Sequence, residues 1–286
     1  ASVRIVDTHT NIVQIEKNWQ VIFEDKTTSL ELKADHSALI MKQIWDFSQT
    51  VDIDDVKEIL DRQITCNMAI ANEGIHNSYG ANIGHVILNM DSDCVKTRAK
   101  AYAAAGSDAR MNGCELPVVI NSGSGNQGIT CCVPVVVYAK ELDCTQEQLY
   151  RALALSNLTA IYIKTGIGTL SAFCGAVSAG AAAGAGIAYL HNGTYKEIQH
   201  TIVNALAILS GTICDGAKAS CAAKIASSVD AGIMGYYMYK NKQQFYAGDG
   251  IVAHSVDETI QNIGTLGSQG MLQTNDKIIE MMISCD

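Results

Sequence analysis

The sequence predicts a mainly α-helical protein, a multi-helix domain with a few N-terminal β-strands (α+β overall). Three observations predict this class. Apolar residues alternate with a period of two over about the first 35 residues and recur every three or four residues from Ser37 onward. Only Pro117 and Pro134 interrupt the 286 residues. The chain is rich in alanine and glycine and poor in aromatic residues, which favours closely packed helices.

The N-terminal segments are typical of strands. VRIVDTHTNIVQIE (3–16) and QVIFED (20–25) predict a hairpin that turns near Lys17 and Asn18, and SLELK (29–33) predicts a further strand. So few strands cannot cover a core. We therefore expect residues 1–36 to complete a sheet begun in a missing N-terminal region of the same chain, and residues 37–286 to form the helical domain.

The rest of the chain predicts a series of helices. Their approximate ranges are 37–49, 52–74, 92–113, 145–164, 194–213, 216–240 and 255–271. We expect Asp91 or Ser92 to cap the third of them, Thr145 and Gln148 to form a capping box, and Asp215 to cap the helix that follows it.

Charge and composition exclude several classes of function. The net charge of −9 argues against nucleic acid or an anionic membrane surface as a partner, and no stretch predicts a membrane span. Ten cysteines without a signal-peptide pattern, in a chain of this size, favour free thiols in the cytoplasm over a disulfide framework. An alanine- and glycine-rich helical surface is also compatible with a homodimer.

Cys174, Cys214 and Cys221 have unusual surroundings. Core cysteines usually lie among leucine, valine and phenylalanine, whereas these lie among glycine, alanine and serine, with DGAKAS between the last two. Small neighbours leave room for a bulky inorganic group. Three thiolates can hold three irons of a [4Fe–4S] cluster and leave one iron open to a substrate. Zinc fits less well, because its structural sites usually pair ligands two to four residues apart.

The other cysteines are interpreted as small buried hydrophobic residues. Cys131 and Cys132 are adjacent in a predicted helix, so their side chains diverge. The remaining members of this group are Cys66, Cys94, Cys114, Cys144 and Cys285.

A glycine-rich segment, GSGNQG, follows the strand-like LPVVI (116–120) and precedes a predicted helix. It matches the formal dinucleotide-binding pattern, but no series of alternating strands and helices surrounds it, and no acid follows on a second strand. Backbone N–H groups at a helix N-terminus also bind small anions such as an amino-acid carboxylate. A simple interhelical turn remains a third interpretation. The candidate substrate-binding residues are Asn121, Ser122, Gly123, Ser124, Gly125, Asn126 and Gln127.

Three further polar residues are candidates for catalysis. Lys164 precedes the segment that carries Cys174, and Lys218 lies between the other two cysteines. A cation there could anchor a carboxylate or balance the charge of a cluster, although a lysine near a helix end is usually solvated. His76 lies in a glycine-punctuated segment, where a lone histidine is more often structural.

The segments INSGSGNQGI (120–129), IKTGIG (163–168), FCGA (173–176) and CDGAKASCAAK (214–224) resemble the iron–sulfur L-serine dehydratase alpha-chain family, in the branch that includes L-cysteine desulfidases. The resemblance runs from about Asp7 to the C-terminus. It implies a [4Fe–4S] cluster on Cys174, Cys214 and Cys221. Family members carry a longer N-terminal region with a further functional cysteine. Serine-specific relatives fill the open iron with a C-terminal cysteine, but we interpret Cys285, at the C-terminus here, as structural.

The resemblance implies a lyase that performs β-elimination on a small amino acid. The products are pyruvate, ammonia and sulfide from L-cysteine, or pyruvate and ammonia from L-serine. An open iron would bind the leaving group, the glycine-rich loop would hold the carboxylate, and a base would take the α-proton. The alternatives are a pyridoxal-phosphate eliminase, a non-catalytic cluster-binding or structural helical protein, and a dinucleotide-binding oxidoreductase. We expect this chain by itself to have weak activity at most.

Overall fold

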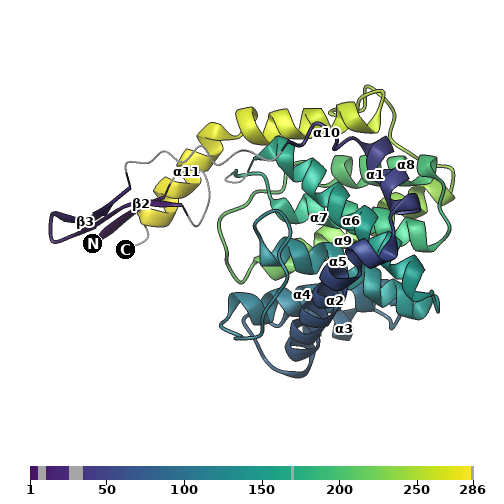
Figure 1. Cartoon of the computed structure of the whole chain (residues 1–286), viewed down its shortest axis with the longest axis horizontal. Helices are drawn as coiled ribbons and strands as arrows, with labels where there is room; N and C mark the ends of the chain where they lie inside the picture. Colours follow the sequence, from purple (N-terminus) through teal and green to yellow (C-terminus); the bar gives the residue numbers. More distant parts are fainter. Residues whose placement is uncertain (6–10, 26–34, 169–170, 285–286) are drawn as a thin grey trace.

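The computed structural model describes residues 1–5, 11–25, 35–168 and 171–284. Figure 1 shows a helical body from which a small sheet and the last helix project to one side. Within the described ranges, every strand lies before residue 25 and the helices begin at Met41. This arrangement confirms the predicted mainly α class with N-terminal strands.

The sheet is antiparallel, with strand order β1 (Ser2–Ile5), β2 (Ile12–Lys17), β3 (Gln20–Glu24). Asn18 and Trp19 connect β2 to β3 with φ angles of 51° and 66°. A two-residue hairpin turn with both φ angles positive matches the twist of its strands. The hairpin predicted near this point is therefore confirmed, whereas SLELK lies outside the described residues.

One face of this sheet is apolar and exposed. Val3 pairs with Ile15, and Ile15 pairs with Phe23, so the three side chains share a face. Val3 is 53% and Phe23 44% exposed. The described residues therefore leave this face largely uncovered. The assignment of residues 1–36 to a larger sheet stays a prediction.

The helical body is built around α7, which packs against α5, α6, α8 and α9. A second group joins α2, α3 and α4, and α4 also contacts α5 and α9. The helices are α1 (Met41–Thr50), α2 (Ile53–His76), α3 (Ile83–Met90), α4 (Val95–Met111), α5 (Gly125–Glu141), α6 (Gln146–Ile167), α7 (Gly175–Leu190), α8 (Tyr195–Ile208), α9 (Cys221–Lys240), α10 (Val256–Thr265) and α11 (Leu272–Ile283), with a π-helical segment, Leu266–Gly270, between the last two.

Helices α7 and α9 approach each other backbone to backbone. A Cβ atom on Gly232 would lie 2.2 Å from the carbonyl oxygen of Gly180, and one on Gly184 would lie 2.6 Å from that of Gly232. Only glycine permits this separation. The contact fixes the relative position of the two helices whose N-termini carry Cys174 and Cys221.

Capping explains several helix starts. The box predicted for Thr145 and Gln148 is present, and the same box recurs at Thr194 and Ser255. The predicted cap of α4 was wrong, since its N-cap is Cys94. Asp91 instead accepts from Lys100 at 3.0 Å.

The start of α9 also differs from the prediction. This helix begins at Cys221 with Ser220 as its N-cap, and not at Gly216. Asp215 does not cap it, because its carboxylate forms an ion pair with Lys224 inside the helix.

Three segments differ from the predicted secondary structure. Residues 83–90 form α3 and residues 272–283 form α11, and neither helix was predicted. The strand-like residues 116–120 form no strand. The backbone N–H of Val119 donates to Asn67 Oδ1 at 2.8 Å, and its carbonyl accepts from Asn67 Nδ2 at 3.2 Å. A buried amide side chain thus takes the place of a neighbouring strand.

None of the helices in the described ranges has the length and apolar character that crossing a membrane requires.

Candidate active site

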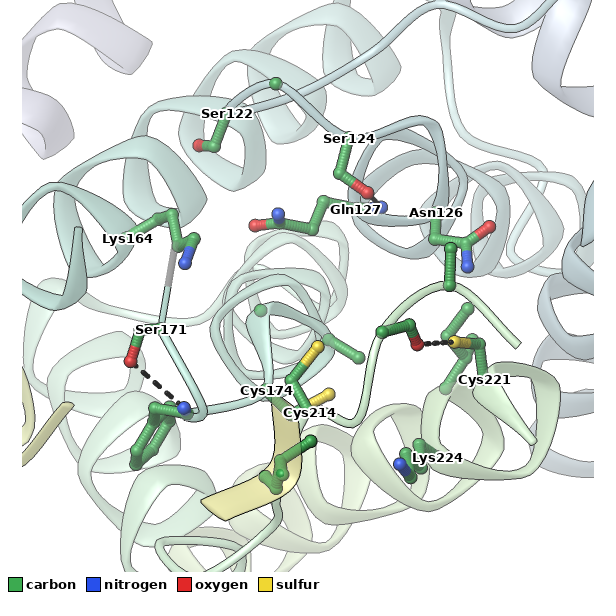
Figure 2. Close-up of a pocket in the computed structure, with 18 of the residues that line it drawn as sticks. Ser122, Ser124, Asn126, Gln127, Lys164, Ser171, Cys174, Cys214, Cys221 and Lys224 are labelled. Atoms are coloured by element: carbon green, nitrogen blue, oxygen red, sulfur yellow. Dashed lines mark hydrogen bonds between the residues drawn. The ribbon is translucent and has the colours of Figure 1, made fainter. Parts of the chain in front are cut away.

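A cavity of about 540 Å³ opens between the N-terminal ends of α5, α7 and α9 and one side of α11. Figure 2 shows several of its polar and sulfur-bearing side chains pointing inward. Three of its lining residues are cationic, and none of the described lining residues is acidic. The residues that carry its chemistry are Arg110, Ser122, Ser124, Asn126, Gln127, Lys164, Cys174, Cys214, Cys221 and Lys224.

Cys174 and Cys214 are held side by side by a short antiparallel bridge between their segments. The N–H of Cys174 donates to the carbonyl of Thr212 at 3.1 Å, and that of Cys214 donates to the carbonyl of Ala172 at 2.7 Å. The two side chains share a hydrogen bond. Donation by Cys174 lowers the pKa of Cys214 to about 6, and the same contact raises the pKa of Cys174.

Cys221 reaches the cavity from the first turn of α9. Its Sγ accepts from the backbone N–H of Lys218 at 3.5 Å and lies 3.6 Å from the carbonyl oxygen of Gly216. The structure therefore brings all three predicted cysteines to one cavity (Figure 2). Their role as metal ligands stays a prediction.

The donor set of the cavity fits an iron–sulfur cluster better than a single ion. In the part of the chain that the structure describes, no three Cys, His, Asp or Glu side chains converge on one metal position. A cluster is larger than an ion, so its ligands need only surround a common space. Three thiols together with three cations suit a negatively charged group of that size.

The glycine-rich loop forms a tight turn ahead of α5. Ser122 and Gly123 have φ angles of 48° and 77°, and the backbones of Asn121 and Ser124 exchange two hydrogen bonds, of 3.1 and 3.0 Å. The Ser124 hydroxyl then caps the helix by accepting from the N–H of Gln127. No parallel strand precedes this turn in the described residues, so the setting of a dinucleotide-binding turn is missing.

Five of the seven predicted loop residues line the cavity, namely Ser122, Gly123, Ser124, Asn126 and Gln127. Asn121 does not line it, because its buried side chain donates to Asn157. Gly125 also lies outside the lining. A Cβ atom there would be 2.3 Å from Nε of Arg110, so this glycine makes room for the guanidinium.

Lys164 is the predicted lysine that reaches the cavity. It is 7% exposed, and its Nζ donates to the carbonyl of Gly168 at 2.5 Å. Burial lowers the pKa of its amine, an effect that negative charge on Cys214 and Cys174 opposes. A buried lysine with a lowered pKa can serve as a base.

Two other predicted residues are not brought to the cavity. His76 ends α2 on the surface, where its Nδ1 lies 2.7 Å from the carbonyl oxygen of Asn72. Lys218 is exposed and does not line the cavity. Cys285 lies outside the described residues. The other nine cysteines are all free.

Two cations of the cavity were missed from the sequence. Lys224 follows Cys221 by three residues, a spacing that places both on one helix face and could have identified it. Arg110 lies in the last turn of α4, and its Nη1 donates to Asn126 Oδ1 at 3.2 Å. No local pattern connects Arg110 with the loop, because tertiary packing brings them together.

The fold and the cavity thus define a helical protein with a thiol-rich, cationic site. The family model of the serine dehydratase alpha chain matches residues 10–280, so the chain belongs to this family. A UPF0597 protein of Desulfitobacterium hafniense strain Y51 is 58% identical over 98% of this chain and 66% of its own length.

Two more UPF0597 proteins are similar. One from Lachnoclostridium phytofermentans is 52% identical over 99% of this chain and 68% of its own length. One from Treponema denticola is 46% identical over 98% of this chain and 67% of its own length. The chain therefore spans about two thirds of the length of these relatives. No solved structure matches it.

Proposed function

We propose that this chain forms the catalytic body of a lyase that eliminates the β-substituent of a small L-amino acid. L-Cysteine would give pyruvate, ammonia and sulfide, and L-serine would give pyruvate and ammonia. The observation that carries this proposal is the shared cavity, in which three cysteines face the N-terminal end of α5. Membership of the serine dehydratase alpha chain family supports the same reaction class.

Cys174, Cys214 and Cys221 would hold a [4Fe–4S] cluster, which supplies a Lewis acid for the leaving group when it is bound. The nearby cations Lys224 and Arg110 would offset its negative charge. The three small residues beside these cysteines, Gly175, Gly216 and Ala217, also line the cavity and leave space there.

The remaining wall would bind and orient the amino acid. The first N–H groups of α5 and the hydroxyl of Ser124 suit a carboxylate, whereas the Ser122 hydroxyl donates to Asn121 Oδ1. Arg110 adds a positive charge beside Asn126. Fixing the carboxylate there directs the α-carbon and its β-substituent toward the cysteines, which lowers the entropic part of the barrier.

Lys164 is the residue we propose as the base. In its neutral form, Nζ takes the α-proton while the bond from Cβ to the leaving group breaks. The enamine so formed tautomerises to an imine, and water hydrolyses the imine to pyruvate and ammonia. The burial of Lys164 and the lowered pKa of its amine favour the neutral form that the proton transfer needs.

The complete activity is proposed for the longer protein that the relatives represent. In a chain as long as these relatives, an N-terminal region would supply the rest of the site and cover the small sheet. We also propose that the protein acts in the cytoplasm, as a homodimer, on a small amino acid.

The test is an anaerobic preparation of the full-length protein, with analysis of iron and sulfide and assays of pyruvate from L-cysteine and L-serine. We expect Cys214→Ser to lose both iron and activity. Cys94→Ser is the matched control, because Cys94 caps α4 outside the cavity lining and serine also caps helices. Normal pyruvate formation by Cys214→Ser without iron would contradict the cluster mechanism.

A further inference from the structure

Gln127 occupies a distinctive place in the cavity. It is the third residue of α5, the residue is 6% exposed, and its amide lies at the cavity wall (Figure 2). Its Oε1 is buried and has no hydrogen-bond partner among the described residues. A buried acceptor without a donor is unfavourable in the folded protein, and a ligand that donates to it removes this penalty.

The glycine at the start of α7 holds this amide in place. A Cβ atom on Gly175 would lie 2.7 Å from both Cδ and Nε2 of Gln127. The amide is therefore packed against the backbone that follows Cys174. Because α5 and α7 pack together along their length, the acceptor is fixed in position before any ligand arrives.

The charges of the cavity determine what kind of donor fits. Among the described lining residues, Arg110 and Lys224 are cationic, Lys164 is the proposed neutral base, and none is a carboxylate. An amino acid brings an anionic carboxylate and a cationic ammonium. The carboxylate has these two cations to approach. The ammonium finds no carboxylate, and the thiolates are assigned to the cluster, so it needs a neutral acceptor.

We propose that Gln127 Oε1 accepts a hydrogen bond from the α-ammonium of the substrate, while Arg110 and the N-terminal end of α5 bind its carboxylate. This inference rests on the proposed function and adds the residue by which the site selects a free amino group. Carboxylic acids without that group would leave Oε1 unpaired and bind more weakly.

The test is calorimetric binding of L-alanine and propanoate to the anaerobically prepared full-length protein. The two ligands share the carboxylate and differ in the ammonium, and L-alanine carries no β-leaving group, so it binds without elimination. We expect Gln127→Leu to weaken L-alanine binding about 10- to 100-fold and propanoate binding less than about twofold. Gln127→Glu retains an acceptor and should preserve the preference for L-alanine.

The control is Gln261→Leu, the same substitution on the exposed surface of α10, and thermal unfolding verifies that each variant is folded. Equal weakening of both ligands by Gln127→Leu, unchanged L-alanine binding, or no binding of either ligand to the unsubstituted protein would overturn the proposal. A Gln127-dependent preference in a protein that forms no pyruvate would refute the lyase function and leave the ammonium site standing.

Discussion

Helices α7 and α11 both line the cavity, but α7 is packed inside the protein and α11 is not. Fourteen of the 16 residues of α7 are buried, whereas no residue of α11 is. The first turn of α7 brings the backbone beside Cys174, while α11 contributes Asn275, Ile278, Ile279 and Met282. Figure 1 shows α7 inside the body and α11 projecting from it.

The difference indicates how the site is divided. All the thiols and cations of the cavity lie on the wall formed by the packed helices, where backbone contacts fix their positions. The α11 wall adds one amide and apolar side chains, of which Ile279 remains 49% and Met282 45% exposed. Chemistry that depends on sub-ångström placement thus belongs to the packed wall, and α11 provides cover.

Substitution of Lys164 should have the largest effect. Lys164→Met in the full-length protein removes the proposed base while filling its buried site with a side chain of similar length. We expect kcat for pyruvate formation to fall by about 10²- to 10⁴-fold with iron content unchanged. Lys218→Met is the control, since Lys218 does not line the cavity. Full activity in Lys164→Met would assign the proton transfer to another group.

Replacing an isoleucine by alanine should lower the free energy of unfolding more on the packed wall than on the α11 wall. Ile225 is fully buried on α9 and Ile279 is half exposed on α11, and both line the cavity. We expect Ile225→Ala to lower the free energy of unfolding by about 2–5 kcal/mol, and Ile279→Ala to change it by about 0.5 kcal/mol or less. Denaturant unfolding of this chain measures both. Similar losses would show that α11 is as firmly packed as α9.

The glycine contact behind the packed wall should be the next most sensitive feature. Gly232→Val places a side chain against the backbone of Gly180, so we expect a loss of about 1–3 kcal/mol in the free energy of unfolding. Gly211→Ala is the control, because no atom lies within 4 Å of its Cβ position. An unchanged unfolding midpoint in Gly232→Val would mean that the two helices can separate without cost.

The periodicity of the sequence predicted the helical class because burial of one helix face imposes it, and the capping box at Thr145 followed from local chemistry alone. The prediction from sequence missed α11, which has no buried residue, although Ile278, Ile279 and Met282 line the cavity at a helical spacing. It also misread residues 116–120 as a strand. The apolar run there is real, but the amide of Asn67 satisfies its backbone, and no local signal reveals that partner.

Some residues of the candidate site could also be predicted from local sequence, and others could not. The three cysteines and most of the glycine-rich loop could be identified from the sequence, because small neighbouring residues leave space for a ligand. Arg110 could not, since its guanidinium reaches the loop only after α4 packs beside α5. The burial of Gln127 Oε1 without a partner likewise depends on tertiary packing, because Gly175 lies against the amide.

The smallest effect is expected at the exposed sheet, which extends the comparison from α11 to the N-terminus. Phe23 is 44% exposed on a face that the described residues leave uncovered, so Phe23→Ser in this chain should change the free energy of unfolding of the helical body by about 0.5 kcal/mol or less. In the full-length protein, we expect the same substitution to cost about 2 kcal/mol or more if further chain packs on this face. Equal, small effects in both proteins would show that residues 1–36 complete no larger sheet. The difference between the two measurements, rather than either alone, therefore reports what covers the apolar face.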